Sequence, residues 1–318
     1  MNSSGGTKPL VKIITDSAAD IPREEAQKYD IDVLAIPITI DGETYMEGED
    51  LTTAEFYKLL GRAKELPTTA QVTPYRYLEA FEKAARAGYD HIVCVTINAK
   101  GSGMFEAAQL AKELFAEEQP VLAEQVTVDV LDSGAYTYIY GHAVVDAARA
   151  AAEGKSREDV VQVFLRRSES YQVYFGLTNL DYARRSGRVT TAAAFVGEVL
   201  GFRPVLTVRG GGIDTIAKVR GDQKLVAAML DLYKAVRGRA GLLHGVRRQQ
   251  SHGPAAAQAH RKRDQGQMPW GVLHRRVGDH QLRPHGIRGF GAGGPNQIIY
   301  LHKTNTRLLG GGCLCVRG

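Results

Sequence analysis

Cysteine, tryptophan and long apolar runs are scarce in this sequence. Its 318 residues include three cysteines and one tryptophan. Few, irregularly spaced cysteines argue against a disulfide-bonded secreted protein and give no complete zinc site. No apolar run approaches the roughly 20 residues of a membrane-spanning helix, and residues 1–9 lack the apolar stretch of a secretory signal. We therefore expect a cytoplasmic protein with no membrane span and no metal or other cofactor.

Acidic residues are nearly absent from the last part of the chain. Residues 241–318 contain 12 lysines and arginines, two aspartates and no glutamate, whereas residues 1–240 contain 28 basic and 33 acidic residues. The net charge of +5 therefore combines a negative first part with a strongly positive end. Either a basic tail for nucleic acid or a reading-frame shift near residues 234–243 explains this change. The basic clusters have no interleaved aromatic residues, so we expect no nucleic-acid partner.

The reading-frame hypothesis rests on the pattern after about residue 236. Arginine, histidine, glutamine and glycine dominate there, and almost no helical or strand periodicity remains. On this hypothesis, residues 241–318 are an aberrant basic segment that is not natively folded, and His274, His280 and His285 carry no functional role. Sequencing the gene tests it, since another frame should then encode a different and more regular segment.

Apolar, β-branched runs alternate with helical patterns in the first half of the chain. Residues 11–14, 31–40, 92–97 and 126–131 indicate strands, and each strand precedes a short polar turn or a helix. Such strand-to-helix steps predict an α/β fold whose first domain, residues 10–165, contains a doubly wound, mostly parallel sheet.

Capping and turn residues mark where the helices and hairpins begin. Thr52 and Glu55 form a capping-box pattern, and Thr73 followed by Pro74 is typical of a helix start, as is Ser156. Asp-Gly at 41–42 predicts a hairpin turn, and residues 66–74 are expected to form a loop. These signals fix several element boundaries before any tertiary contact is considered.

A second domain is expected from residue 166 to 240. Residues 204–209 and 213–219 flank three glycines and predict an antiparallel hairpin, in contrast to the parallel pairing before them. Residues 180–189 indicate a short basic helix, and 190–200 an apolar one. The change in pairing marks a domain boundary near residue 166.

The turn between residues 98 and 103 is the first candidate site. Its sequence, Asn-Ala-Lys-Gly-Ser-Gly, lies between a buried strand and a helix, where free N–H groups and the helix dipole favour a phosphate or a carboxylate. An ordinary strand-to-helix turn is the alternative. Asp16 and Asp132 also follow strands, and helix capping is the simplest role for each.

Six segments, taken in order, resemble the signature segments of the DegV family. They are residues 14–22, 67–71, 100–103, 131–133, 180–189 and 212–220. The resemblance implies a two-domain α/β protein that binds one long-chain fatty acid between its domains. It also implies that the protein is not itself an enzyme, and that it presents the acyl carboxylate to a separate fatty acid kinase that makes the acyl phosphate.

The resemblance also assigns roles to individual residues. Thr69 and Ser102, with Gly103, match the positions that hold the carboxylate, and Arg188 matches an arginine near the phosphoryl-transfer site. The segment with Asp16 and Ser17 is expected close to the same head group. Two other classes stay open, a nucleotide-binding phosphotransferase and a nucleic-acid binder with a basic tail.

Overall fold

The computed structural model divides into two compact units, Met1–Ser170 with Gly210–Gly212, and Tyr171–Arg209 with Ile213–Gly318. Within them it describes residues 10–170, 173–177, 201–248, 298–302, 306–309 and 313–316. The division follows Ser170, whereas the sequence predicted a boundary after residue 165. No helix in these described ranges combines the length and the apolar character needed to cross a membrane.

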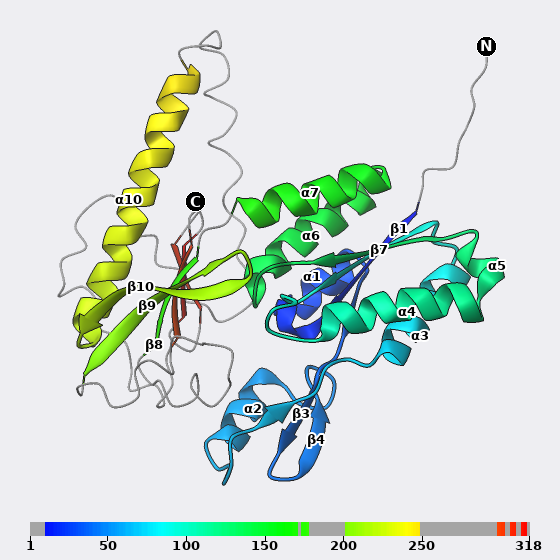
Figure 1. Ribbon diagram of the computed structural model, residues 1–318, viewed down its shortest axis with the longest axis horizontal. Helices are drawn as coiled ribbons and strands as arrows, with labels where there is room; N and C mark the ends of the chain where they lie inside the picture. Colours follow the sequence, from blue (N-terminus) through cyan, green and yellow to red (C-terminus); the bar gives the residue numbers. More distant parts are fainter. Residues whose placement is uncertain are drawn as a thin grey trace. The chain divides into compact units, whose positions relative to one another are not determined.

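A four-stranded parallel sheet forms the centre of the first unit (Figure 1). Its strands, in the order β2-β1-β6-β7, are β2 (Ile31–Leu34), β1 (Val11–Asp16), β6 (His91–Thr96) and β7 (Thr127–Asp132). β1 lies beside β6 with Ile13 opposite Val93 and Thr15 opposite Val95. The prediction of a mostly parallel sheet is confirmed.

Helices cover both faces of this sheet. One face packs against α3 (Pro74–Arg86) and α4 (Met104–Glu118), and the other against α1 (Arg23–Lys28), α6 (Tyr138–Ala152) and α7 (Arg157–Glu169). Successive residues of β6 alternate between these two cores, with Cys94 in the first and Val95 in the second. Both are fully buried, and burying a side chain such as valine contributes about 1.5–3 kcal/mol.

The predicted helix starts have the expected caps. The Thr73 hydroxyl accepts a hydrogen bond from the Arg76 N–H at 3.4 Å, with Pro74 in the first turn. Ser156 caps α7 in the same way. Helix α2 (Thr53–Leu60) carries the reciprocal bonds of a capping box between Thr52 and Glu55. Each cap stabilises its helix by about 1 kcal/mol.

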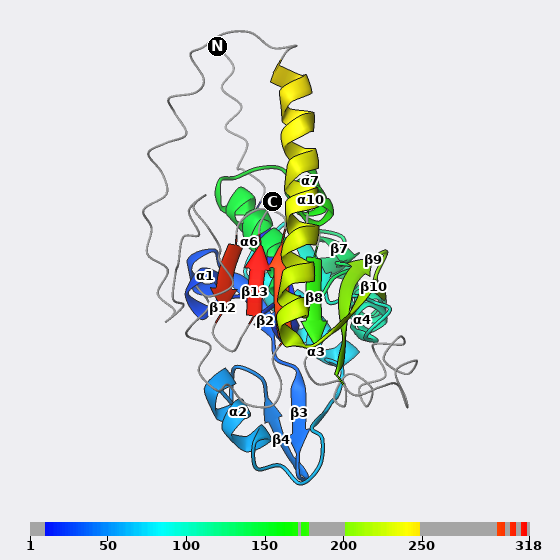
Figure 2. The same ribbon diagram turned by 90° about the vertical axis from the view of Figure 1, so that its left-hand side faces the viewer.

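A small antiparallel sheet with α2 forms a separate lobe of the first unit (Figures 1 and 2). Its order is β4-β3-β5, with β4 (Glu43–Met46), β3 (Pro37–Ile40) and β5 (Thr68–Thr69). Asp41 and Gly42 both have positive φ, 49° and 92°, as the predicted hairpin turn requires. The core of this lobe centres on Ile38, Ile40 and Leu51.

Two predictions about this region need correction. Residues 31–40 are not one strand, because β2 and β3 belong to different sheets. At the break, the Ile36 N–H donates to the Ser17 hydroxyl at 3.1 Å, and Pro37 has no N–H to offer a ladder. Residues 66–74 are not wholly a loop either, since Thr69 lies on β5 opposite Ile38.

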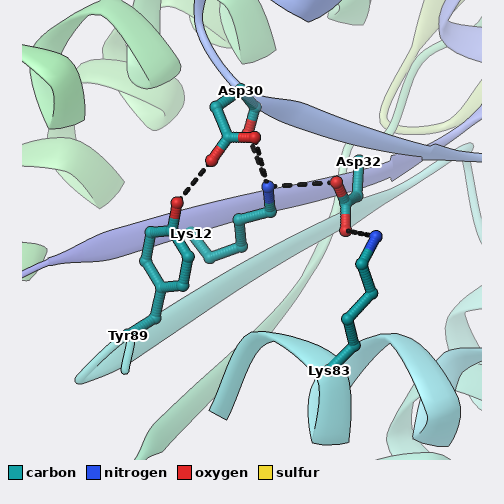
Figure 3. Close-up of polar contacts among 5 residues, drawn as sticks. All are labelled: Lys12, Asp30, Asp32, Lys83 and Tyr89. Atoms are coloured by element: carbon teal, nitrogen blue, oxygen red, sulfur yellow. Dashed lines mark hydrogen bonds and ion pairs between the residues drawn. The ribbon is translucent and has the colours of Figure 1, made fainter. Parts of the chain in front are cut away.

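A buried lysine connects the starts of β1 and β2 (Figure 3). Lys12 Nζ lies 2.8 Å from Asp30 Oδ1 and 3.0 Å from Asp32 Oδ1, and Lys83 from α3 also reaches Asp32, at 3.5 Å. The Tyr89 hydroxyl donates to Asp30. This network lies at the amino end of the parallel strands, away from the edge where ligands bind in such sheets.

The second unit contains a mostly antiparallel sheet of order β10-β9-β8-β11. The strands are β8 (Val173–Leu177), β9 (Phe202–Arg209), β10 (Gly212–Arg220) and β11 (Ile298–His302), and β9 and β10 flank the glycines as predicted. The helix α10 (Asp222–Arg248) packs Leu225 and Met229 against Tyr174 and Val205. β8 pairs antiparallel with both β9 and β11.

The described part of the last segment contains more regular structure than its sequence pattern predicts. α10 continues to Arg248, and β12 (Thr306–Leu309) pairs with β13 (Cys313–Val316). β11 pairs with β8 through its backbone, which needs no particular side-chain period. Residues 249–297 lie outside the described residues, together with His274, His280 and His285, so the reading-frame hypothesis stays a prediction.

Candidate functional site

The strand order places a topological switch point between β1 and β6. The chain leaves β1 toward β2 on one side and leaves β6 toward β7 on the other, so α1 and α4 cover opposite faces. In open α/β sheets, ligands bind in the crevice at the carboxyl ends of two such strands. Here those ends carry the helical turn η1 (Ser17–Ala19) and the turn of residues 97–103.

Asp16 lies at this edge with its carboxylate buried, and both of its oxygens accept hydrogen bonds from protein groups. Oδ2 accepts a hydrogen bond from the Ile97 N–H at 2.8 Å, and Oδ1 accepts from the Tyr140 hydroxyl at 2.6 Å and the Ala18 N–H at 3.1 Å. Burial raises the pKa of Asp16 to about 6, although these three hydrogen bonds lower it. Asp16 therefore caps η1, as predicted, and also fixes the start of the turn after β6.

Ser17 has no proton left for a ligand. Its hydroxyl donates to Glu47 Oε2 at 2.6 Å and accepts from the Ile36 N–H at 3.1 Å. Because a serine hydroxyl has a single proton, a carboxylate could gain that donor only by displacing Glu47. In this structure Ser17 connects β1 to the small lobe that carries Thr69.

A second aspartate fixes the other side of the same turn. Asp132 Oδ1 accepts hydrogen bonds from the Ala99 N–H at 3.0 Å and the Gly134 N–H at 2.9 Å. Its predicted role as a helix cap is wrong, because α6 begins several residues later with Thr137 as its N-cap. Asp16 and Asp132 thus hold Ile97 and Ala99, so the turn enters α4 in one orientation.

The N-terminus of α4 has no side-chain cap. Its N-cap residue is Gly103, and the first helical bond runs from the Ala107 N–H to the Gly103 carbonyl. Ser102 is half-buried, and its hydroxyl has no hydrogen-bond partner within the described part of the chain. Ser102 therefore keeps a free donor at the positive end of a 15-residue helix.

Gln71 brings the loop that carries Thr69 against this terminus. A Cβ added to Gly103 would lie 2.1 Å from Gln71 Oε1, so the amide occupies the space of the missing side chain. Tyr136 covers Gly101 in the same way, with its hydroxyl 2.5 Å from the position of an added Cβ. These close approaches explain why the turn uses glycine at both positions.

Thr69 completes the set of hydroxyls that the sequence predicted here. It is exposed on β5, two residues before Gln71, and no hydrogen bond of its side chain occurs among the described residues. The sequence motif contained Gln71 without assigning it a role, and its contact with Gly103 is a tertiary one. Arg188 lies outside the described residues, so its predicted role is not tested.

Two further acids near Asp16, Asp20 and Glu47, were not predicted from the sequence. The side chain of Asp20 reaches solvent, but crowding by surrounding protein atoms, together with the charges of Glu47 and Asp16, raises its pKa to about 7. The described residues contain no group of three or more histidines, cysteines or acids arranged to hold a metal ion.

The fold and this edge define a class of two-unit α/β proteins with a parallel, doubly wound sheet in one unit and a mostly antiparallel sheet in the other. The DegV family model, described as "Uncharacterised protein, DegV family", matches residues 10–269, and the chain belongs to that family. The match extends past residue 240 into the basic segment.

Individual relatives agree with this assignment. A DegV domain-containing protein of Caldanaerobacter subterraneus subsp. tengcongensis is 33% identical over 224 residues, which cover 70% of this chain and 76% of the relative. Among solved structures, a DegV family protein from Thermus thermophilus, described for fatty acid binding, is 27% identical, with a TM-score of 0.62 over 71% of this chain and 77% of its own. A stearic acid-binding protein from Eubacterium ventriosum is also 27% identical, with a TM-score of 0.64 over 72% and 78%.

Proposed function

We propose that this protein binds a long-chain fatty acid and holds its carboxylate with Thr69, Ser102 and Gly103. The observation that carries the proposal is the contact of Gln71 with Gly103, because it brings the Thr69 loop to the uncapped start of α4. Two similar solved structures, one of them of a DegV family protein, are described as binding a fatty acid, which supports the same ligand class.

The chemistry of the site suits a carboxylate. Two free hydroxyls and the N–H groups of α4 are all donors, and a hydrogen bond to a charged group contributes about 1.5–3 kcal/mol. The acyl chain supplies most of the affinity, since burial of each CH₂ contributes about 0.8 kcal/mol. The polar edge then fixes which end of the ligand points to the turn.

Asp16 and Ser17 take positioning roles in this proposal. Their polar atoms bond to Ile97, Tyr140, Glu47 and other protein groups, so they shape the site without donating to the ligand. This differs from the prediction that they belong to the lipid-binding residues themselves.

The proposed partner is a separate fatty acid kinase in the cytoplasm. The protein itself transfers no phosphate in this proposal, and it exposes the acyl carboxylate so that the kinase forms the acyl phosphate. Arg188 is proposed to lie near the transferred phosphoryl group, because guanidinium is planar, always charged and suited to phosphate. Arg188→Ala should then slow acyl-phosphate formation and leave fatty-acid affinity unchanged, and a selective loss of affinity would contradict this role.

Mass spectrometry of lipids extracted from the purified protein tests the function. We expect a co-purified long-chain fatty acid, and a delipidated sample should take up about one equivalent from solution. A protein that arrives empty, binds no fatty acid and instead binds a nucleotide or nucleic acid would overturn the proposal in favour of one of the two other classes.

A further inference from the structure

The amide of Gln71 fills the space beside the N-cap of α4, where Gly103 has no side chain. An N-cap residue usually supplies an oxygen to the first N–H groups of its helix, and Gly103 has none to supply. The Oε1 atom of Gln71 lies only 2.1 Å from the point where the Cβ of a larger N-cap residue would be, so it leaves no room for one. Because Gln71 comes from the loop before α3, this oxygen reaches the terminus from another part of the chain.

We infer that Gln71 is a selectivity residue for the ligand head group: its amide lies against Gly103 without ligand and turns its NH₂ group to donate to a bound carboxylate. The inference rests on the proposed function and adds a residue that the function did not assign. The head group that Gln71 selects is one that only accepts hydrogen bonds, such as a carboxylate.

The amide is suited to both arrangements. Its carbonyl oxygen accepts from N–H groups, and its NH₂ group donates to an anion. Rotation about the last torsion exchanges these two groups without changing the space they fill, and that torsion is broad. The Gln71 side chain is exposed, so this rotation needs no change in the core.

The neighbouring polar groups are already engaged by protein partners. On the turn itself, Lys100 Nζ donates to the Gly210 carbonyl at 2.7 Å, and the Asn98 amide donates to the Gly211 carbonyl. Ser17 already donates to Glu47, and the Asp16 carboxylate accepts three protein hydrogen bonds. Glu47 is an acid and repels a carboxylate. Gln71, which lies against Gly103, can present a donor to an anion there without giving up a hydrogen bond to the described part of the chain.

Gln71→Glu is the sharpest variant, because it keeps the shape of the side chain and replaces its donor with a negative charge. We expect the affinity for palmitate to fall by about tenfold or more, through repulsion and the lost hydrogen bond. Gln71→Met, which has neither donor nor charge, should lose less. Gln125→Glu is the matched control, since Gln125 is exposed before β7 at the amino end of the sheet and should not change affinity.

The ligand-free proteins give a readout that does not depend on fatty-acid binding. A carboxylate at the α4 terminus interacts favourably with the helix dipole, so Gln71→Glu should melt about 1–4 °C above wild type, whereas Gln125→Glu should not. If wild type binds palmitate and Gln71→Glu binds it with equal affinity, the inference is overturned and the proposed function stands. Absence of palmitate binding in wild type would overturn the proposed function, and the melting shift would still test where Gln71 lies.

Discussion

The Tyr140 hydroxyl donates a hydrogen bond of 2.6 Å to Asp16, and both groups are buried. Asp16 also accepts from the Ile97 N–H, so α6, the end of β1 and the start of the Ser102 turn meet at one carboxylate. This geometry explains how Asp16, which is buried, controls the position of the turn that carries Ser102.

Asp16→Asn should destabilise the protein although the side chain keeps its size. Either orientation of the amide points its NH₂ group at a backbone N–H, of Ile97 or of Ala18, and two donors then face each other. Burying an unsatisfied donor costs about 1–3 kcal/mol, which urea denaturation would measure. Tyr140→Phe should lose less, because it removes only one of three donors. Wild-type stability in Asp16→Asn would contradict this description of the carboxylate.

Stability should increase as the pH falls from about 7.5 to about 5. Burial raises the pKa of Asp16 to about 6, and desolvation by surrounding protein atoms is the chief cause that raises the pKa of the more accessible Asp20 to about 7, from the value of 3.8 that is ordinary for an aspartate. The folded protein therefore binds more protons than the unfolded chain in this window, and the stabilisation is lost as the pH rises through these values. Desolvation acts against the charged form of Asp30, but hydrogen bonds from Lys12 and Tyr89 lower its pKa, so its effect falls below this window.

Denaturation at the two pH values measures this effect. Asp20→Asn should flatten the dependence, because it removes the group with the higher pKa. A variant whose stability still changes with pH as much as wild type would show that Asp20 does not titrate in this range.

Glu47 should matter for ligand affinity through its hydrogen bond rather than its charge. Glu47→Gln keeps an acceptor for the Ser17 hydroxyl, whereas Glu47→Ala removes it and loosens the small lobe that carries Thr69. We expect fatty-acid affinity near wild type or higher in Glu47→Gln, and severalfold weaker in Glu47→Ala. Hydrogen exchange at β5 should quicken only in Glu47→Ala. Equal losses in both variants would favour a role for the charge.

Lys12→Met should separate stability from binding. The change leaves Asp32, which is largely buried, with only the exposed Lys83 as its ion-pair partner, and such a loss costs roughly 1–3 kcal/mol after allowance for partial exposure and for that remaining pair. Because Lys12 lies at the amino end of β1, the folded variant should bind fatty acid with wild-type affinity below its melting temperature. A specific loss of affinity at full folding would show that this edge also contributes to the site.

Local chemistry was enough to predict much of the first unit. Asp41-Gly42, the capping box of Thr52 and the Thr73-Pro74 helix start depend on neighbouring residues only, and the structure has all three. The parallel sheet followed from buried β-branched runs separated by helices, since that alternation leaves few other arrangements. The hydroxyls of the site came from the family resemblance.

The remaining features depend on contacts between distant segments. Nothing near Ser17 in the sequence shows that its proton goes to Glu47, 30 positions away. The break after β2 follows from the same hydroxyl, which accepts the Ile36 N–H and takes it out of any ladder. Gln71 approaches α4 closely because Gly103 has no side chain, and a tertiary contact of that kind has no signal in the local sequence.

Titration of a delipidated protein with palmitate tests the account most directly. The double variant Thr69→Ala, Ser102→Ala removes both free hydroxyls, and Thr127→Ala, which removes an exposed hydroxyl at the start of β7, is the control. We predict stoichiometric binding by wild type and the control, and an affinity about a hundredfold weaker in the double variant, as two charge-assisted hydrogen bonds are lost. Equal affinity in all three proteins would contradict the assignment of Thr69 and Ser102 as the groups that hold the carboxylate.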